Sequence, residues 1–176
     1  LSWGNAFSHG WPYQGLELSA AWRKRAGNWQ VLLPSLSLWR DSFGVEAEMV
    51  LNLDDKPDMD LVAELKNVPV TEAEHFFPLH HMPQSVIKYL KPALLSGDVS
   101  SGKVLWSGEF GQYPYAEHNG TFQALASVVG AEFQFDADWP SLTELSAELL
   151  FENASMTIQS QAGFLVDAPV QQGVTV

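Results

Sequence analysis

Cysteine is absent from the 176 residues of this chain. Disulfide frameworks and zinc sites built on cysteine thiolates are therefore excluded. The absence is compatible with an oxidising compartment, but by itself it does not assign one. The hydrophobic fraction of 46% is enough to build a sizeable core.

Basic residues are scarce, with nine Lys and Arg against 21 Asp and Glu, for a net charge of −12. The last of them is Lys103, so residues 104–176 carry nine acidic side chains and no basic one. Such a surface repels phosphate backbones, which argues against nucleic-acid binding. It also argues against docking on anionic lipid headgroups through a basic patch.

Long apolar runs are also missing, because no stretch of about 18 consecutive apolar residues occurs. We therefore expect no membrane-spanning segment within this chain. The sequence begins at Leu1 without Met and without a signal-peptide pattern. Residues 174–176 look like strand rather than tail, and we expect both ends to be cuts within a longer protein.

What the sequence has in abundance is alternation of apolar and polar residues, which is typical of half-buried antiparallel strands. Pro34 interrupts the second alternating stretch and shifts its phase by one, as expected at an edge position or a bulge. Residues 54–57 form a strong turn signal. Residues 120–162 repeat strand, short turn and strand. The pattern predicts a mainly β fold, an antiparallel meander.

One stretch, at about residues 71–96, breaks the β pattern. Thr71 and Glu74 have the spacing of a capping box, which predicts the start of a short helix. A second helix is predicted over residues 83–95, with Gly97 placed to end it. The apolar face of this second helix consists of Val86, Ile87, Leu90 and Leu94.

These patterns divide the chain into three parts within one segment, residues 1–176. Residues 1–68 form a first strand meander, residues 69–97 a helical insert, and residues 98–176 a second strand meander. The two helices are too short to cover one whole side of such a sheet. Either the sheet curls on itself, or an apolar trough remains for a ligand.

No motif for catalysis or metal binding stands out. A possible zinc-binding group around Pro78 consists of His75, His80, His81, Glu72 and Glu74. Its spacing matches no HExxH helix, so a structural role is favoured. The acidic residues 54–60 lack the glycine and terminal glutamate of an EF-hand. No G-x-S-x-G elbow or phosphate loop occurs either, and we predict no enzymatic activity, metal or cofactor.

A series of short stretches carries a family resemblance. They are residues 74–76, 79–83, 89–94, Gly97, 104–108, the Tyr-Pro-Tyr of 113–115, 119–124, the Asp-Trp-Pro-Ser-Leu of 138–142, and 149–153. As an ordered set, over roughly residues 70–160, they resemble the AsmA-like proteins of Gram-negative bacteria. The similarity is specifically to the central region of the YhdP branch.

The resemblance implies a periplasmic protein that is anchored in the inner membrane by an N-terminal helix. Its body would be a long, taco-shaped β-groove with an apolar interior, here a large, twisted, curved sheet with a two-helix insertion at about 71–96. Such proteins are implicated in phospholipid transport between inner and outer membranes and in outer-membrane integrity. The family has no catalytic motif to carry over. This chain would be one segment of the conduit, next to other segments of the same protein.

On this interpretation phospholipid acyl chains contact the apolar sides of the strands, and the acidic residues lie on the opposite side. The lipid-contact candidates are Trp22, Val31, Val45, Met49, Leu61, Trp106, Phe122, Phe133, Phe135, Leu145, Leu149, Phe151 and Ile158. By its position and amphipathic pattern, the helical insert would gate or plug the groove through Val86, Ile87, Leu90 and Leu94.

Two other interpretations stay open. The chain would otherwise be a non-catalytic structural or protein-interaction module of a large periplasmic protein, pairing its sheet edges with a partner. A glycan-binding or hydrolytic β-domain would use Trp platforms and pairs of acids. Exposed Trp side chains would support that last interpretation.

Overall fold

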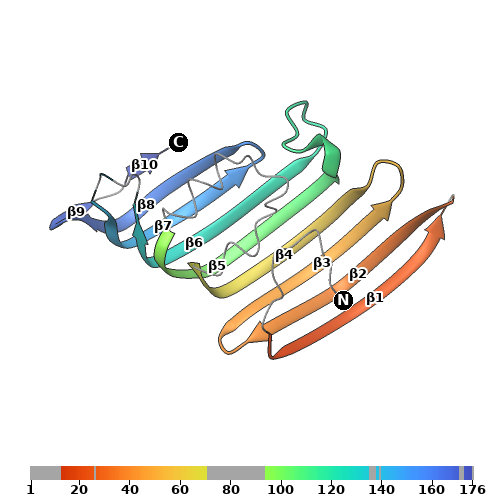
Figure 1. The fold of residues 1–176 in the computed structure, drawn as a ribbon, viewed down its shortest axis with the longest axis horizontal. Coiled ribbons are helices and arrows are strands. Elements are labelled where there is room, and N and C mark those ends of the chain that lie inside the picture. Colours follow the sequence, from red (N-terminus) through yellow and green to blue (C-terminus); the bar gives the residue numbers. More distant parts are fainter. Residues whose placement is uncertain are drawn as a thin grey trace.

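The computed structural model describes residues 13–25, 27–70, 94–134, 138, 140–170 and 173–175. Ten β-strands of the described residues form one antiparallel sheet (Figure 1). A short 3₁₀ turn, η2 (Phe110–Gln112), follows the fifth strand. The strands are β1 (Gly15–Arg25), β2 (Asn28–Arg40), β3 (Phe43–Leu53), β4 (Asp58–Pro69), β5 (Leu94–Glu109), β6 (Thr121–Phe133), β7 (Leu142–Glu152), β8 (Ser155–Leu165), β9 (Ala168–Val170) and β10 (Gly173–Thr175).

The strand order in the sheet follows the chain from β1 to β8, and the short strands β9 and β10 both pair with β8. β1 and β8 lie far apart in the row (Figure 1), so the described sheet is open rather than closed on itself. The predicted mainly β, antiparallel meander is therefore confirmed. Among the described residues, no helix has the length and apolar character needed to cross a membrane.

Short polar turns join successive strands. In the predicted turn between β3 and β4, the carboxylate of Asp54 accepts a hydrogen bond from the Lys56 N–H at 2.9 Å. Asp41 and Asn153 turn the chain after β2 and β7 with φ angles of 52° and 53°. Asp and Asn tolerate this left-handed region better than most residues. Local reversals of this kind explain why strands that are adjacent in sequence pair with one another.

Pro34 causes the phase shift that the sequence predicts. Leu33 pairs with Met49 and Leu36 pairs with Ala47, so β2 contains one residue more than β3 in this interval. Proline has no N–H to donate to the ladder, and the bulge leaves it unpaired. Leu33 and Leu36 consequently lie on the same face of the sheet.

The expected helical insertion at about 71–96 is wrong for residues 94–96, which belong to a strand. Residues 71–93 lie outside the described residues, and with them Val86, Ile87 and Leu90. Leu94, which was expected on the second helix, begins β5 and pairs with Phe133. Gly97, the expected helix terminator, lies inside β5 with φ of 110°. The helical spacing of leucines was misleading there, because β5 already pairs with β6.

β6 also differs from its expected form. The alternation that ends at Val128 and resumes at Phe133 predicts two strands separated by a turn. The structure has one strand, in which Gly130 adopts φ of 59° and the pairing with β7 shifts between Val128 and Ala131. A bulge restores the phase, so Ala131 and Phe133 join Val128 in one buried cluster.

Most of the buried side chains form two clusters on the sheet, and none of the buried residues described is polar or charged. The smaller cluster consists of Trp106, Tyr115 and Phe122. The larger cluster consists of Leu38, Phe43, Val45, Val68, Val70, Val99, Val128, Ala131, Phe133, Leu142, Leu145, Ala147 and Leu149.

Replacement of Gly97 tests the close approach of β5 to β6. A Cβ at this position would lie 2.5 Å from the Ala131 Cα, and φ of 110° is strained for any other residue. We expect Gly97→Ala to lower the free energy of unfolding by about 2–4 kcal/mol, measured by urea denaturation. Gly44→Ala is the matched control, because nothing lies within 4 Å of its added Cβ. Equal stability of the two variants would contradict the described packing.

Candidate functional site

Strand register places the apolar side chains on one surface of the sheet, which we name the apolar face. Trp22 on β1 pairs with Val31 on β2, which pairs with Leu51 on β3. Further along the sheet, Leu61 on β4 pairs with Trp106 on β5. Directly opposed residues of antiparallel strands project to the same side. The apolar face therefore extends across the sheet from β1.

The predicted lipid-contact residues that the structure describes all lie on the apolar face. Phe135, another predicted lipid-contact residue, lies outside the described residues. Contact of these side chains with lipid stays a prediction. The residues placed on this face are Trp22, Val31, Val45, Met49, Leu61, Trp106, Phe122, Phe133, Leu145, Leu149, Phe151 and Ile158.

Solvent exposure divides the apolar face into a packed part and an open part. On β5 to β7, Trp106, Phe133 and Leu149 are only 3%, 2% and 7% exposed. On β1 and the adjoining hairpin end, Trp22 is 71% exposed and Trp29 is 50% exposed. We name the exposed part the open strip, and it consists of Leu16, Leu18, Trp22, Trp29 and Leu53.

This division narrows the set of residues that are available to a ligand. Side chains that are already buried pack against the protein itself, and they belong to the core rather than to a free surface. Among the predicted contact residues these are Val45, Trp106, Phe122, Phe133, Leu145 and Leu149. The half-buried ones are Val31, Met49, Leu61, Phe151 and Ile158, and Trp22 is mostly exposed.

An aromatic cluster closes one end of the packed part. We name it the aromatic cap, and it consists of Trp106, Phe110, Tyr113, Tyr115 and Phe122. Tyr113 stacks on Trp106 with ring centroids 5.3 Å apart and 19° between the planes. Phe122 meets Trp106 edge-on at 5.2 Å, and Tyr115 does so at 6.2 Å. Such geometries stabilise beyond simple area burial.

The connection between β5 and β6 is held over the sheet by glycine and asparagine. A Cβ on Gly120 would lie 2.3 Å from the Tyr115 ring, so only glycine lets this ring approach. The Asn153 Oδ1 accepts a hydrogen bond from the Phe122 N–H at 2.8 Å, and its carbonyl accepts one from the Tyr113 hydroxyl at 3.3 Å. The cap is thereby tied to the turn between β7 and β8.

Burial affects the two cap tyrosines. It raises the pKa of the Tyr113 hydroxyl and of the Tyr115 hydroxyl above the ordinary value. The neighbouring Trp106 indole partly opposes this rise by lowering the pKa of Tyr115. The Tyr115 hydroxyl and the Trp106 indole N–H are both buried, and neither has a partner in good hydrogen-bond geometry.

The opposite surface, which we name the polar face, carries a chain of hydrogen bonds across four strands. The Arg23 Nε donates to Gln30 at 2.7 Å, Gln30 donates to Asn52 at 2.6 Å, and Asn52 donates to Asp58 at 2.7 Å. These four residues form one row across β1 to β4. The polar face is thus organised by side-chain pairing between strands.

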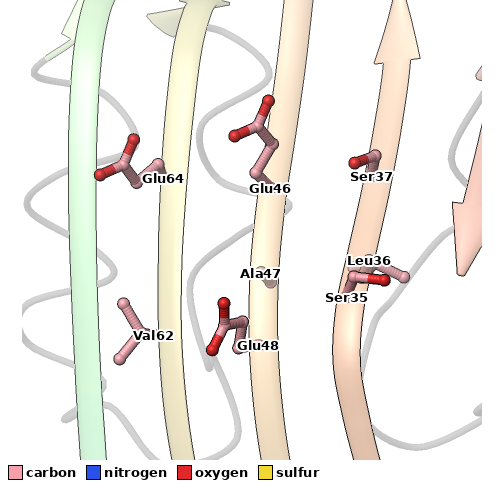
Figure 2. Close-up of a pocket in the computed structure, with 8 residues that line it drawn as sticks. All are labelled: Ser35, Leu36, Ser37, Glu46, Ala47, Glu48, Val62 and Glu64. Carbon is pink, nitrogen blue, oxygen red and sulfur yellow. The ribbon is translucent and has the colours of Figure 1, made fainter. Parts of the chain in front are cut away.

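Acidic residues gather on the polar face, as expected. Glu46, Glu48 and Glu64 border a shallow hollow of about 280 Å³ (Figure 2). Lys66 lies 3.9 Å from Glu46 and Lys103 lies 3.3 Å from Glu64, both pairs well exposed. Exposed pairs of this kind contribute little to stability.

No ligand set for a metal ion accompanies these carboxylates. Across the part of the chain that the structure describes, no three His, Cys, Asp or Glu side chains come together as metal ligands. The histidine and glutamate group around Pro78 lies outside that part. The hollow is therefore a feature of the polar surface, lined by three carboxylates of which Glu46 and Glu64 are paired with lysines.

The whole chain, residues 1–176, matches the family model described as YhdP protein. The chain belongs to the YhdP family. A curated relative, the intermembrane phospholipid transporter YhdP of Escherichia coli (strain K12), is 28% identical over 106 residues. That match covers 60% of this chain but only 8% of the relative's length. No solved structure matches the chain. The resemblance seen in the sequence is thus confirmed.

The features of this YhdP-family chain that sequence reasoning missed are the aromatic cap and the open strip. Tyr113 and Tyr115 carried part of the resemblance, yet their contact with Trp106 depends on the register of β5 and β6. A signal was present in the glycines that bracket them, Gly108 and Gly120, which both approach the Tyr115 ring. The polar face also exposes a few apolar side chains that alternation alone does not explain, namely Val62, Leu105 and Leu125.

Exposed tryptophans bear on the glycan-binding interpretation of this YhdP-family sheet. Trp22 and Trp29 are exposed, as that interpretation requires. Their neighbours across the strands are Val31, Leu53 and Lys24, and the acidic residues of β1 to β4 project from the other face. A pair of acids flanking a sugar is the hallmark of glycoside hydrolysis. The surroundings of these tryptophans fit an apolar ligand better.

Substitution of Tyr115 tests the aromatic cap. We expect Tyr115→Phe to change the melting temperature little, because it removes a buried hydroxyl that has no partner in good hydrogen-bond geometry besides the nearby Trp106 indole. Tyr115→Ala deletes the whole ring and is expected to cost about 3–5 kcal/mol of unfolding free energy. Thermal and urea unfolding of the two variants would check this. A large loss with Tyr115→Phe would show that the hydroxyl has a partner after all.

Proposed function

We propose that this chain forms one segment, residues 1–176, of a periplasmic phospholipid conduit between the inner and outer membranes. The open strip carries the proposal: a band of exposed Leu and Trp side chains on the apolar face of an open sheet. The name of the Escherichia coli relative, an intermembrane phospholipid transporter, supports it. The chain spans 8% of that relative's length, so transport by the whole protein is part of the proposal.

An acyl chain needs a surface from which water and charge are excluded. Transfer of each methylene from water to such a surface is worth about 0.8 kcal/mol. On β1 to β4 the register places Glu17, Glu46, Glu48 and Glu64 on the polar face, away from the acyl path. A carboxylate left without water beside an acyl chain would be costly. The separation of charge from the apolar face therefore suits lipid passage.

The free edge of β1 suggests how the segment is continued. Among the described strands β1 pairs with β2 alone, which leaves one side of its backbone without a strand partner. Unpaired N–H and C=O groups favour the addition of another strand. In the proposal, adjacent segments of the same full-length protein extend the sheet, and the inner-membrane anchor lies outside these residues.

Transport in this proposal involves no chemical step. The apolar face offers aliphatic and aromatic side chains, and burial raises the pKa of its two cap tyrosines further above neutrality. The proposal also divides the segment into two strand meanders, residues 1–68 and 98–176, on either side of residues 69–97. Lipid moves along the sheet because neighbouring positions on the apolar face are chemically alike.

A face-specific substitution tests the proposed path. Leu53→Glu places a carboxylate on the open strip, and Val62→Glu places one on the polar face at a comparably exposed position. We expect Leu53→Glu to reduce phospholipid binding by about ten-fold or more, since a desolvated charge costs more than 1.4 kcal/mol. Val62→Glu should bind as the unaltered chain does. Binding would be measured with a fluorescent phospholipid and by native mass spectrometry of co-purified lipid.

Three results of that experiment would contradict the proposal. Equal loss in both variants would indicate a general effect of added charge. Unaltered binding by Leu53→Glu would place the lipid path elsewhere. Absence of any bound phospholipid in the unaltered chain would favour a structural or protein-interaction module instead.

A further inference from the structure

Three of the nine basic residues in the chain are consecutive, and they end β1. Arg23, Lys24 and Arg25 are exposed, and none forms an ion pair with another described residue. The net charge of −12 therefore conceals a local positive end on the sheet. This end lies at the hairpin between β1 and β2, at the edge of the row of strands (Figure 1).

Alternation along β1 sends these side chains to different faces. Lys24 pairs with Trp29 and shares the apolar face with it, whereas Arg23 pairs with Gln30 on the polar face. The Arg23 guanidinium is engaged there by its hydrogen bond to Gln30 at 2.7 Å. Arg25 pairs with Asn28 at the end of the strand. Lys24 is thus the one member of the group that projects beside the open strip.

The surroundings of Lys24 combine the two chemistries of a phospholipid. Trp22 and Trp29 are exposed on the same face, and Leu53 follows on the next strand. Tryptophan and basic residues together are typical of the boundary between acyl chains and phosphates. A lysine side chain can lie along apolar surface with its methylenes while its ammonium reaches the phosphate.

We propose that Lys24 binds the phosphate of a phospholipid whose acyl chains lie on the open strip. This inference rests on the proposed function and adds the headgroup contact to it. Asp54 and Asp55 follow Leu53 on β3, roughly 10 Å from β1 because two strand spacings intervene, so the phosphate is held on the β1 side. The net negative charge of the whole chain argued against headgroup binding, but the end of β1 carries a local positive charge.

Paired lipids and face-matched variants test the proposal. The probes are a short-chain phosphatidylglycerol and the diacylglycerol with the same acyl chains, which lacks the phosphate. We expect Lys24→Gln to weaken phosphatidylglycerol binding about five-fold and to leave diacylglycerol binding unchanged. Arg23→Gln, whose side chain lies on the polar face, should bind both lipids as the unaltered chain does. Isothermal calorimetry on the whole chain gives the affinities, and circular dichroism checks folding.

The possible outcomes separate this inference from the proposed function. If Arg23→Gln weakens binding as much as Lys24→Gln, the effect comes from the overall positive charge of this end rather than from a contact with Lys24, and the inference fails. It also fails if inorganic phosphate alone binds with the same dependence on Lys24, or if only sedimentation with phosphatidylglycerol vesicles responds to Lys24→Gln. If the unaltered chain binds neither lipid, the proposed function fails as well. Loss restricted to phosphatidylglycerol in Lys24→Gln supports the phosphate contact.

Discussion

A sheet with one apolar face has to bury that face, and this requirement governs most of the structure. The meander forms from local reversals, but local pairing leaves the apolar face uncovered. Over β5 to β7 the side chains bury one another, and the aromatic cap seals the end near Trp106. Along β1 the same kind of surface stays exposed at Leu18 and Trp22. The free energy gained in the packed part therefore supports an open strip that alone would be unfavourable.

Period-two alternation predicts which face a side chain occupies, because register error by one residue would expose a whole apolar set. It was sufficient for β1 to β4, for β7 and β8, for the turn at 54–57 and for the bulge at Pro34. It was insufficient at Leu94 and Gly97, where a short apolar run fits a helix face as well as a strand. The decisive fact there is the close approach of Gly97 to Ala131, which is a contact between distant parts of the chain.

In the candidate site, too, the sequence predicts what depends on neighbouring residues but not what depends on contacts between distant parts of the chain. The face of Trp106 and of Trp22 follows from the sequence, but their exposures, 3% and 71%, differ because the cap covers only one of them. Whether a loop folds back over a sheet depends on small residues such as Gly120 and on partners such as Asn153. Alternation along the sequence carries no information on either contact. The exposed part of the apolar face could therefore be located only once the position of the aromatic cap was known.

Charge is arranged by the same alternation that arranges the apolar face. Acids such as Glu46 and Glu64 fall on the polar face, where lysines partly neutralise them. Lys24 falls on the other face because it is one residue from Arg23, and its position at the strand end keeps it hydrated. A lipid on the open strip would meet apolar side chains along the sheet and a cation only where the sheet ends. That order matches the order of groups in a phospholipid, from acyl chain to phosphate.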